Sequence, residues 1–165
     1  MEPHRTQIKI KDPKQVVLRI WIARLLVGII TVFSLQAAFS FILSPGGFVY
    51  AYELSGPAGE AAVRGAGVLF LMWNVPHLFA LLDPIRYRLA LFFAVLMQFI
   101  GLIGGIYVFF TLSMELIILR STILRFITFD GMGLLLLLVA YFLVRDSLPY
   151  QYGQNSSVNG RLNMR

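Results

Sequence analysis

The chain divides into four long apolar stretches, separated by charged and helix-breaking residues. The first three stretches hold no charged residue over residues 25–52, 65–82 and 89–114. A run of about 20 apolar residues is long enough to cross a bilayer as an α-helix. The pattern therefore predicts an all-α integral membrane four-helix bundle, with membrane spans at residues 21–43, 60–82, 89–112 and 126–144.

Pro and Gly mark the predicted ends of the first two spans. Ser44-Pro45-Gly46-Gly47 follows the first span, and Asp83-Pro84 follows the second. The uncharged part of the fourth stretch, residues 131–144, would extend only about 21 Å as a helix. Because a hydrocarbon core is about 30 Å thick, we expect Asp130 to lie within the fourth span.

The composition supports a membrane location and excludes several chemistries. Of the 165 residues, 58% are apolar and 13% are charged, and the mean hydropathy is +0.78. A soluble domain of this length has too little interior to bury so much apolar surface. The absence of cysteine excludes disulfides, thiolate metal sites and c-type haem attachment. We expect a basic leader at residues 1–20, a membrane domain at 21–145 and a polar tail at 146–165.

The basic residues predict the orientation of the bundle. An even number of spans places both termini on one side of the membrane. Of the 14 Lys and Arg residues, only Arg64, Arg120 and Arg125 fall on the other side. The positive-inside rule then places both termini in the cytoplasm.

Two charged residues, Arg64 and Asp130, are expected close to the outer face of the predicted spans. Charges inside a bilayer are usually paired, so an ion pair between Arg64 and Asp130 is one hypothesis. In the alternative, Arg64 extends to the surface beside Glu60, and Asp130 caps or hydrates the outer end of the fourth helix. Both residues then have structural roles.

Three carboxamides, Gln36, Asn74 and Gln98, are predicted at similar depths on three different helices. If they face inward, they form an interhelical hydrogen-bond cluster or line a ligand-binding pocket for a carbonyl-bearing molecule such as a quinone headgroup. Ordinary hydrogen bonding between helices is the alternative, and amides alone define no reaction.

His77 is the only histidine within a predicted span, and it follows Pro76. It is a candidate proton acceptor, a ligand to a haem or chlorophyll-type metal, or a hydrogen-bond donor to a quinone. A single histidine makes no conventional metal site, so we predict no metal centre.

No motif of a soluble enzyme is present, because the sequence holds no Gly-rich phosphate loop, no HExxH and no Ser nucleophile elbow. Lys9, Lys11, Lys14, Arg19 and Arg24 lead directly into a predicted span. Anionic lipid headgroups are therefore the expected partner of this leader, and nucleic acid is not.

Three segments resemble the DoxX-like families of small four-helix bacterial membrane proteins. The resemblance covers about residues 22–144, and its motifs are Ser44-Pro45-Gly46-Gly47, Arg64-Gly65-Ala66-Gly67 and Asp83-Pro84-Ile85-Arg86-Tyr87-Arg88. It implies the cytoplasmic (inner) membrane of a bacterium and a link to redox or degradative membrane systems. The family name comes from a subunit associated with a thiosulfate:quinone oxidoreductase. No catalytic residue carries over to this chain.

Together these features predict a non-catalytic accessory or structural subunit. Its expected partners are membrane lipids and other membrane subunits or further copies of the chain. The first alternative is a quinone-linked redox or lipid-modifying component that uses the pocket of carboxamides and His77. The second is a small-solute transporter, which the lack of an ionisable residue at midplane disfavours.

Overall fold

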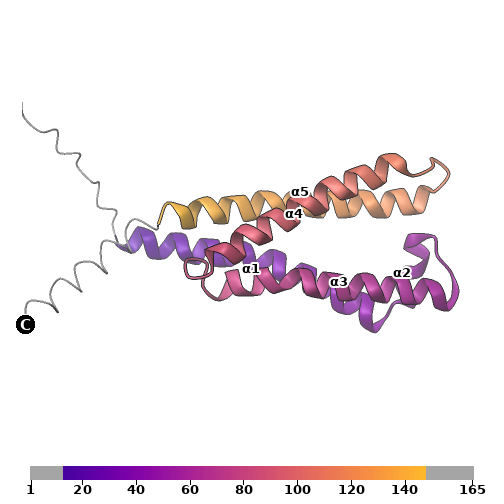
Figure 1. Cartoon of the computed structure of the whole chain (residues 1–165), viewed down its shortest axis with the longest axis horizontal. Helices are drawn as coiled ribbons and strands as arrows, with labels where there is room; N and C mark the ends of the chain where they lie inside the picture. The colour runs from indigo at the N-terminus through magenta and orange to yellow at the C-terminus, as the bar shows by residue number, and fades with distance from the viewer. Residues whose placement is uncertain (1–12, 148–165) are drawn as a thin grey trace, which may run out of the picture.

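The computed structural model describes residues 13–147, which form helices with no strand among them. The four long helices are α1 (Pro13–Leu43), α3 (Gly56–Leu82), α4 (Arg88–Thr111) and α5 (Ile117–Arg145) (Figure 1). The short helix α2 (Gly46–Val49) and the 3-10 turn η1 (Tyr50–Tyr52) connect α1 to α3. The leader before residue 13 and the tail after residue 147 lie outside the described residues.

All four long helices are long and apolar enough to cross a membrane. This confirms the prediction of an all-α bundle, and the chain has the architecture of a multi-pass membrane protein. The described chain starts and finishes at the same end of the bundle, where Arg19 and Asp146 form an ion pair with 3.5 Å between Nη1 and Oδ2 (Figure 1). We call this the terminal end, and the opposite end, which carries α2, the α2 end.

All four long helices begin before their predicted spans, and the difference is largest for α1 and α5. α1 begins at Pro13 rather than at residue 21, and α5 begins at Ile117 rather than at residue 126. The charged residues that end an apolar stretch do not end a helix, because Lys and Arg have high helix propensity. Pro13 itself fits the first helical position, where its missing N–H leaves no hydrogen bond unmade.

Charged side chains cap helix termini at the α2 end. The Glu53 carboxylate accepts hydrogen bonds from the Ile118 and Leu119 N–H groups in the first turn of α5, at 3.0 and 3.1 Å. Arg120 of α5 donates to the Phe109 and Leu112 carbonyls at the end of α4, at 3.1 and 3.0 Å. Both contacts place the charge that the helix dipole favours at that terminus, so they fix α4 and α5 to each other and to η1.

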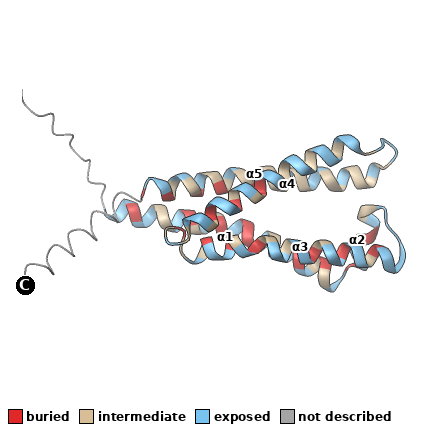
Figure 2. Cartoon of the chain, in the orientation of Figure 1, coloured by how far each residue is buried: buried red, intermediate tan, exposed pale blue. Residues whose placement is uncertain are grey.

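The bundle consists of two helix pairs that pack closely together toward the terminal end and are joined mainly by aromatic side chains toward the α2 end. Buried residues occur along the whole of α1 and α3, but α4 has none after Gln98 and α5 has none before Gly133 (Figure 2). The terminal half is filled by a buried apolar core, whose members are Ala23, Val27, Ile30, Ala80, Leu91, Ala94, Leu137, Ala140 and Val144. The two pairs separate beyond this core (Figure 1).

Gly67 lets α1 and α3 approach closely. A Cβ atom at this position would lie 2.8 Å from the Ala38 carbonyl oxygen and 2.9 Å from Cβ of Phe41. By contrast, a Cβ atom at Gly65, on the same helix, would have no neighbour within 4 Å. Small residues at such crossings allow the van der Waals packing that holds membrane helices together.

We predict that Gly67→Ala destabilises the bundle by about 2 kcal/mol, because α1 must move away from α3 to accommodate the methyl group. Gly65→Ala is the matched control and should be neutral or stabilising by up to about 1 kcal/mol through its helix propensity. Reversible unfolding by dodecyl sulfate in mixed micelles measures both. Equal stabilities of the two variants would contradict the close approach at Gly67.

Candidate functional site

A cavity of about 330 Å³ lies in the half of the bundle toward the α2 end, where the helix pairs separate. α1, α3, α4, α5 and η1 all contribute to its lining, which is mainly apolar. The polar or amphipathic side chains that line it are Ser34, Tyr52, Trp73, Gln98 and Asp130. This size and composition are typical of a site for a small ligand.

A hydrogen bond between Gln98 of α4 and Asp130 of α5 forms the base of the cavity. Nε2 of Gln98 donates to Oδ1 of Asp130 at 2.8 Å. Each side chain lies against a glycine of the opposite helix: a Cβ atom at Gly133 would be 2.7 Å from Nε2 of Gln98, and one at Gly101 would be 3.0 Å from Oδ2 of Asp130. The two glycines therefore make room for a polar contact that joins α4 to α5 at the edge of the buried apolar core of the terminal half.

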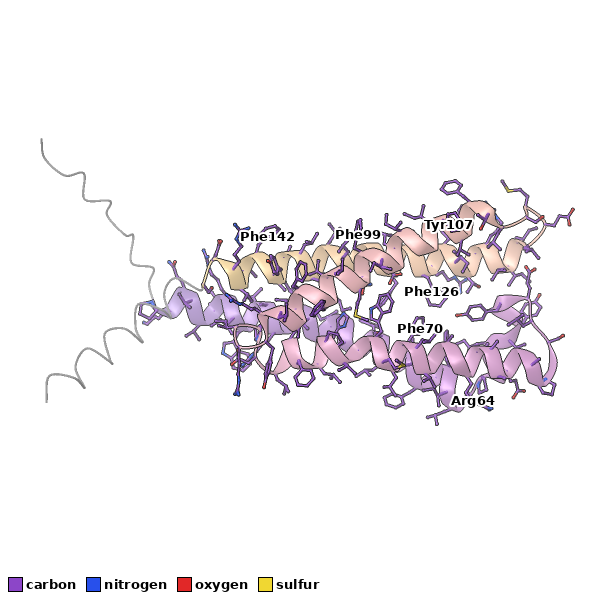
Figure 3. The ribbon with its side chains drawn as sticks, viewed as in Figure 1. Arg64, Phe70, Phe99, Tyr107, Phe126 and Phe142 are labelled. Atoms are coloured by element: carbon purple, nitrogen blue, oxygen red, sulfur yellow. The ribbon has the colours of Figure 1, made fainter. Side chains whose placement is uncertain are left out.

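Aromatic rings form the walls of the cavity toward the α2 end. Phe70 of α3 and Phe126 of α5 point toward each other and form a ring contact in this wall, with 5.8 Å between ring centroids (Figure 3). The ring centroid of Tyr52, in η1, lies 6.3 Å from that of Phe126 and 5.9 Å from that of Phe41. These separations are typical of favourable aromatic pairs, so η1 is held over the cavity by ring packing as well as by Glu53.

A second hydrogen-bonded group joins α3 to α1 beside the cavity. Nδ2 of the buried Asn74 donates to the Phe70 carbonyl and to Oγ of Ser34, both at 2.8 Å. Ser34 accepts this bond and keeps its own hydroxyl hydrogen for another acceptor. Because Ser34 lines the cavity, it adds a hydrogen-bond donor from α1 to the wall.

His77 is buried one turn beyond Trp73 on α3. Its Nδ1 lies 3.2 Å from the Trp73 carbonyl, which only accepts, so Nδ1 carries the hydrogen. Nε2 of His77 and Oδ1 of Asn74 are buried acceptors without a hydrogen-bond partner among the described residues. His77 does not line the cavity.

The structure brings together only some of the residues that the sequence singles out. Gln98 and Asp130 share the cavity, and Asn74 reaches it through Ser34, but Gln36 is exposed on α1. Gln36 is two residues from Ser34, which corresponds to a rotation of about 200° around the helix. It therefore faces away from the predicted layer of carboxamides.

The hypothesised ion pair between Arg64 and Asp130 is not formed. Arg64 lies on the outer side of α3, away from α5, and its Nη2 is 3.9 Å from Oε2 of Glu60 (Figure 3). It also donates from Nε to the Ile42 carbonyl at 3.3 Å. The physical reason is again rotation, because Arg64 is two residues from the cavity-lining Ala66. The arrangement with Glu60 is the alternative that the sequence left open.

Sequence reasoning missed the aromatic part of the site. Helical spacing contains a signal for much of it: Ala66, Phe70 and Trp73 lie on one face of α3, and Ile123, Phe126 and Asp130 on one face of α5. Tyr52 has no such signal, because it belongs to a three-residue 3-10 turn.

No group of three His, Asp or Glu side chains within residues 13–147 has the arrangement of a metal site. No family model, curated protein or solved structure matches the chain. The function is therefore inferred from the cavity.

The Gln98–Asp130 contact is testable by a double-mutant cycle. We expect Gln98→Met to destabilise the protein and to show a coupling of about 1 kcal/mol with Asp130→Ala, because either change removes the same hydrogen bond. Gln36→Met combined with Asp130→Ala is the control cycle and should be additive within about 0.5 kcal/mol. Additive effects of the Gln98 and Asp130 changes in dodecyl sulfate unfolding would contradict the contact.

Tyr52 provides a test of the ring packing over the cavity. Burial raises the pKa of its phenol from 10.0 to about 12. Burial thus favours the neutral phenol, whose stabilising contribution is complete below about pH 10 and is lost as the pH rises to about 12. In a near-ultraviolet absorbance titration, Tyr52→Phe should remove a component with a pKa of about 12. If the difference between the two titrations centres near 10 instead, Tyr52 is not packed as described.

Proposed function

We propose that this chain is a non-catalytic membrane protein that binds a lipid-soluble amphiphile in the cavity of its α2-end half. The observation that carries the proposal is the combination of an apolar, aromatic wall with a polar base made by Gln98 and Asp130. Apolar lining with a few polar groups is the usual composition of a small-molecule site. The apolar lining would accommodate the body of the ligand, and Asp130 and Ser34 would hydrogen-bond to its polar group.

This function is compatible with the broader expectations from the sequence. We propose a bacterial inner-membrane location with both termini in the cytoplasm, on the distribution of Lys and Arg and on the resemblance to DoxX-like proteins. The α2 end then faces outward. A quinone is one amphiphile that would fit this description, with Gln98 at the site and with Asn74 acting through Ser34. The core of the terminal half gives no support to the solute-transport alternative.

A role as an accessory subunit is the second candidate, and one feature of α4 favours it. Gly104 is exposed, and a Cβ atom there would have no neighbour within 4 Å. Ile100, one turn away, is 57% exposed. A small residue on an outward apolar face permits close approach of another membrane helix, from another subunit or from a second copy.

Trp73 makes ligand binding measurable, because it lines the cavity and the chain has only 2 tryptophans. In Trp21→Phe protein, reconstituted in phosphatidylcholine nanodiscs, all tryptophan fluorescence comes from Trp73. We expect the uncharged probe para-bromoneopentylbenzene to quench it along a saturable curve, since bromine quenches on contact and the cavity has a limited capacity.

Two Phe substitutions on α3 provide the controls. Ala66 lines the cavity, whereas Ala62, one turn earlier, is exposed. In the Trp21→Phe background, Ala66→Phe should fill the cavity and abolish the saturable component, and Ala62→Phe should retain it. Quenching that rises in proportion to the probe in all three proteins would reflect dissolution in lipid and would contradict the proposal.

A further inference from the structure

The Asp130 carboxylate has no cationic partner among residues 13–147 to offset the cost of its negative charge in an apolar bundle. Its Oδ1 accepts the hydrogen bond from Gln98, but no cationic side chain of residues 13–147 forms an ion pair with it. Carboxylates within a bilayer are costly and are almost always paired or in contact with water. A positive charge brought into the cavity by a ligand would meet this requirement.

No arginine of the described residues forms an ion pair with Asp130. Arg64 pairs with Glu60 on the far side of α3, and Arg120 binds the carbonyls at the end of α4. Arg24, at the terminal end, donates to the Leu82 carbonyl at 2.7 Å. Arg125, five residues before Asp130 on α5, is exposed and does not line the cavity.

The walls of the cavity complement a cation of a particular kind. Five aromatic side chains line it, and they are Tyr52, Phe70, Trp73, Phe126 and Phe129. The faces of aromatic rings attract cations, and Trp and Tyr rings around a positive centre are the usual recognition device for organic ammonium groups. An inorganic cation would find few oxygen ligands here, because the lining is mainly apolar and no cluster of three acidic or His side chains exists within residues 13–147.

Gly101 leaves room for the second carboxylate oxygen of Asp130, because a Cβ atom at this position would lie 3.0 Å from Oδ2. Oδ2 of Asp130 lies beside Gly101 and the Trp73 ring, at a point where any larger side chain on α4 would cover it. Oδ1 is held by Gln98, so the orientation of the carboxylate is fixed before a ligand arrives. This pre-organisation reduces the cost of binding.

We propose that the cavity binds a hydrophobic organic ammonium ion, with its positive centre against Oδ2 of Asp130 and its apolar body among the aromatic rings. The proposal rests on the proposed function, since it names the chemical class of the amphiphile. A cavity of about 330 Å³ limits the bound part to a small aryl or branched alkyl group.

Two isosteric probes test the charge preference. Para-bromobenzyltrimethylammonium and para-bromoneopentylbenzene have the same shape, because a quaternary nitrogen replaces a quaternary carbon. Both are titrated against Trp21→Phe protein in phosphatidylcholine nanodiscs and compared at equal mole fraction in the bilayer. We expect half-saturation of Trp73 quenching by the cation at a mole fraction about tenfold lower than for the uncharged probe.

Two charge-removing variants locate the source of the preference. Asp130→Asn retains an oxygen acceptor for Gln98 and loses the charge, so it should reduce the preference for the cation to less than about twofold. Glu115→Gln removes the same charge from an exposed residue beyond α4 and should leave the preference unchanged. Circular dichroism of both variants establishes that the helices are retained.

Each remaining outcome counts against a particular statement. Equal saturable binding of the two probes, or tighter binding of the uncharged probe, overturns the ammonium proposal and leaves ligand binding in the cavity intact. A cation preference that persists in Asp130→Asn also overturns it. Absence of saturable quenching by both probes, with Ala66→Phe indistinguishable from its parent, overturns the proposed function itself.

Discussion

The structure depends on one hydrogen bond between two polar side chains placed within an apolar bundle. Gln98 and Asp130 lie where the filled terminal half ends and the cavity begins, and neither would be tolerated there without a partner. Their contact requires Gly101 and Gly133 on the facing helices, because a methyl group at either position would meet the polar atoms. The four residues thus set both the spacing of α4 and α5 and the depth of the cavity.

The cavity persists because both ends of the bundle are held by other contacts. At the α2 end, Glu53 and Arg120 satisfy the free N–H and carbonyl groups of α5 and α4. At the terminal end, the Ala-rich core brings all four helices together, and Arg24 binds the last carbonyl of α3. Helices that are fixed at both ends need not close around the space between them, so a hollow middle is compatible with a stable bundle.

Helix positions were predictable from the sequence, whereas the faces of the helices were not inferred correctly. Apolar run length and the breakers Pro45 and Pro84 predict where α1 and α3 end. Counting residues from the helix ends placed Arg64 and Gln36 at plausible depths, but it ignored rotation about the helix axis, and both residues face away from the cavity. The faces of a membrane helix are difficult to distinguish when apolar residues surround it on every side, because lipid and protein interior favour the same side chains.

Most of the polar residues within the helices carry rotational information that apolar residues lack, and the exposed Gln36 is the exception among the carboxamides. Asn74, Gln98 and Asp130 each turn toward another helix, because an unpaired polar group facing lipid is costly. If Asp130 faces inward, helical spacing places Phe126 on the same inward face of α5. In the same way, an inward-facing Gln98 places Gly101 on the inward face of α4. Arg64 escapes this rule because it lies near a helix end and pairs with Glu60 one turn away, where a long side chain finds partners without entering the bundle. The intramembrane carboxylate, rather than the arginine, is therefore the residue from which the site is best derived.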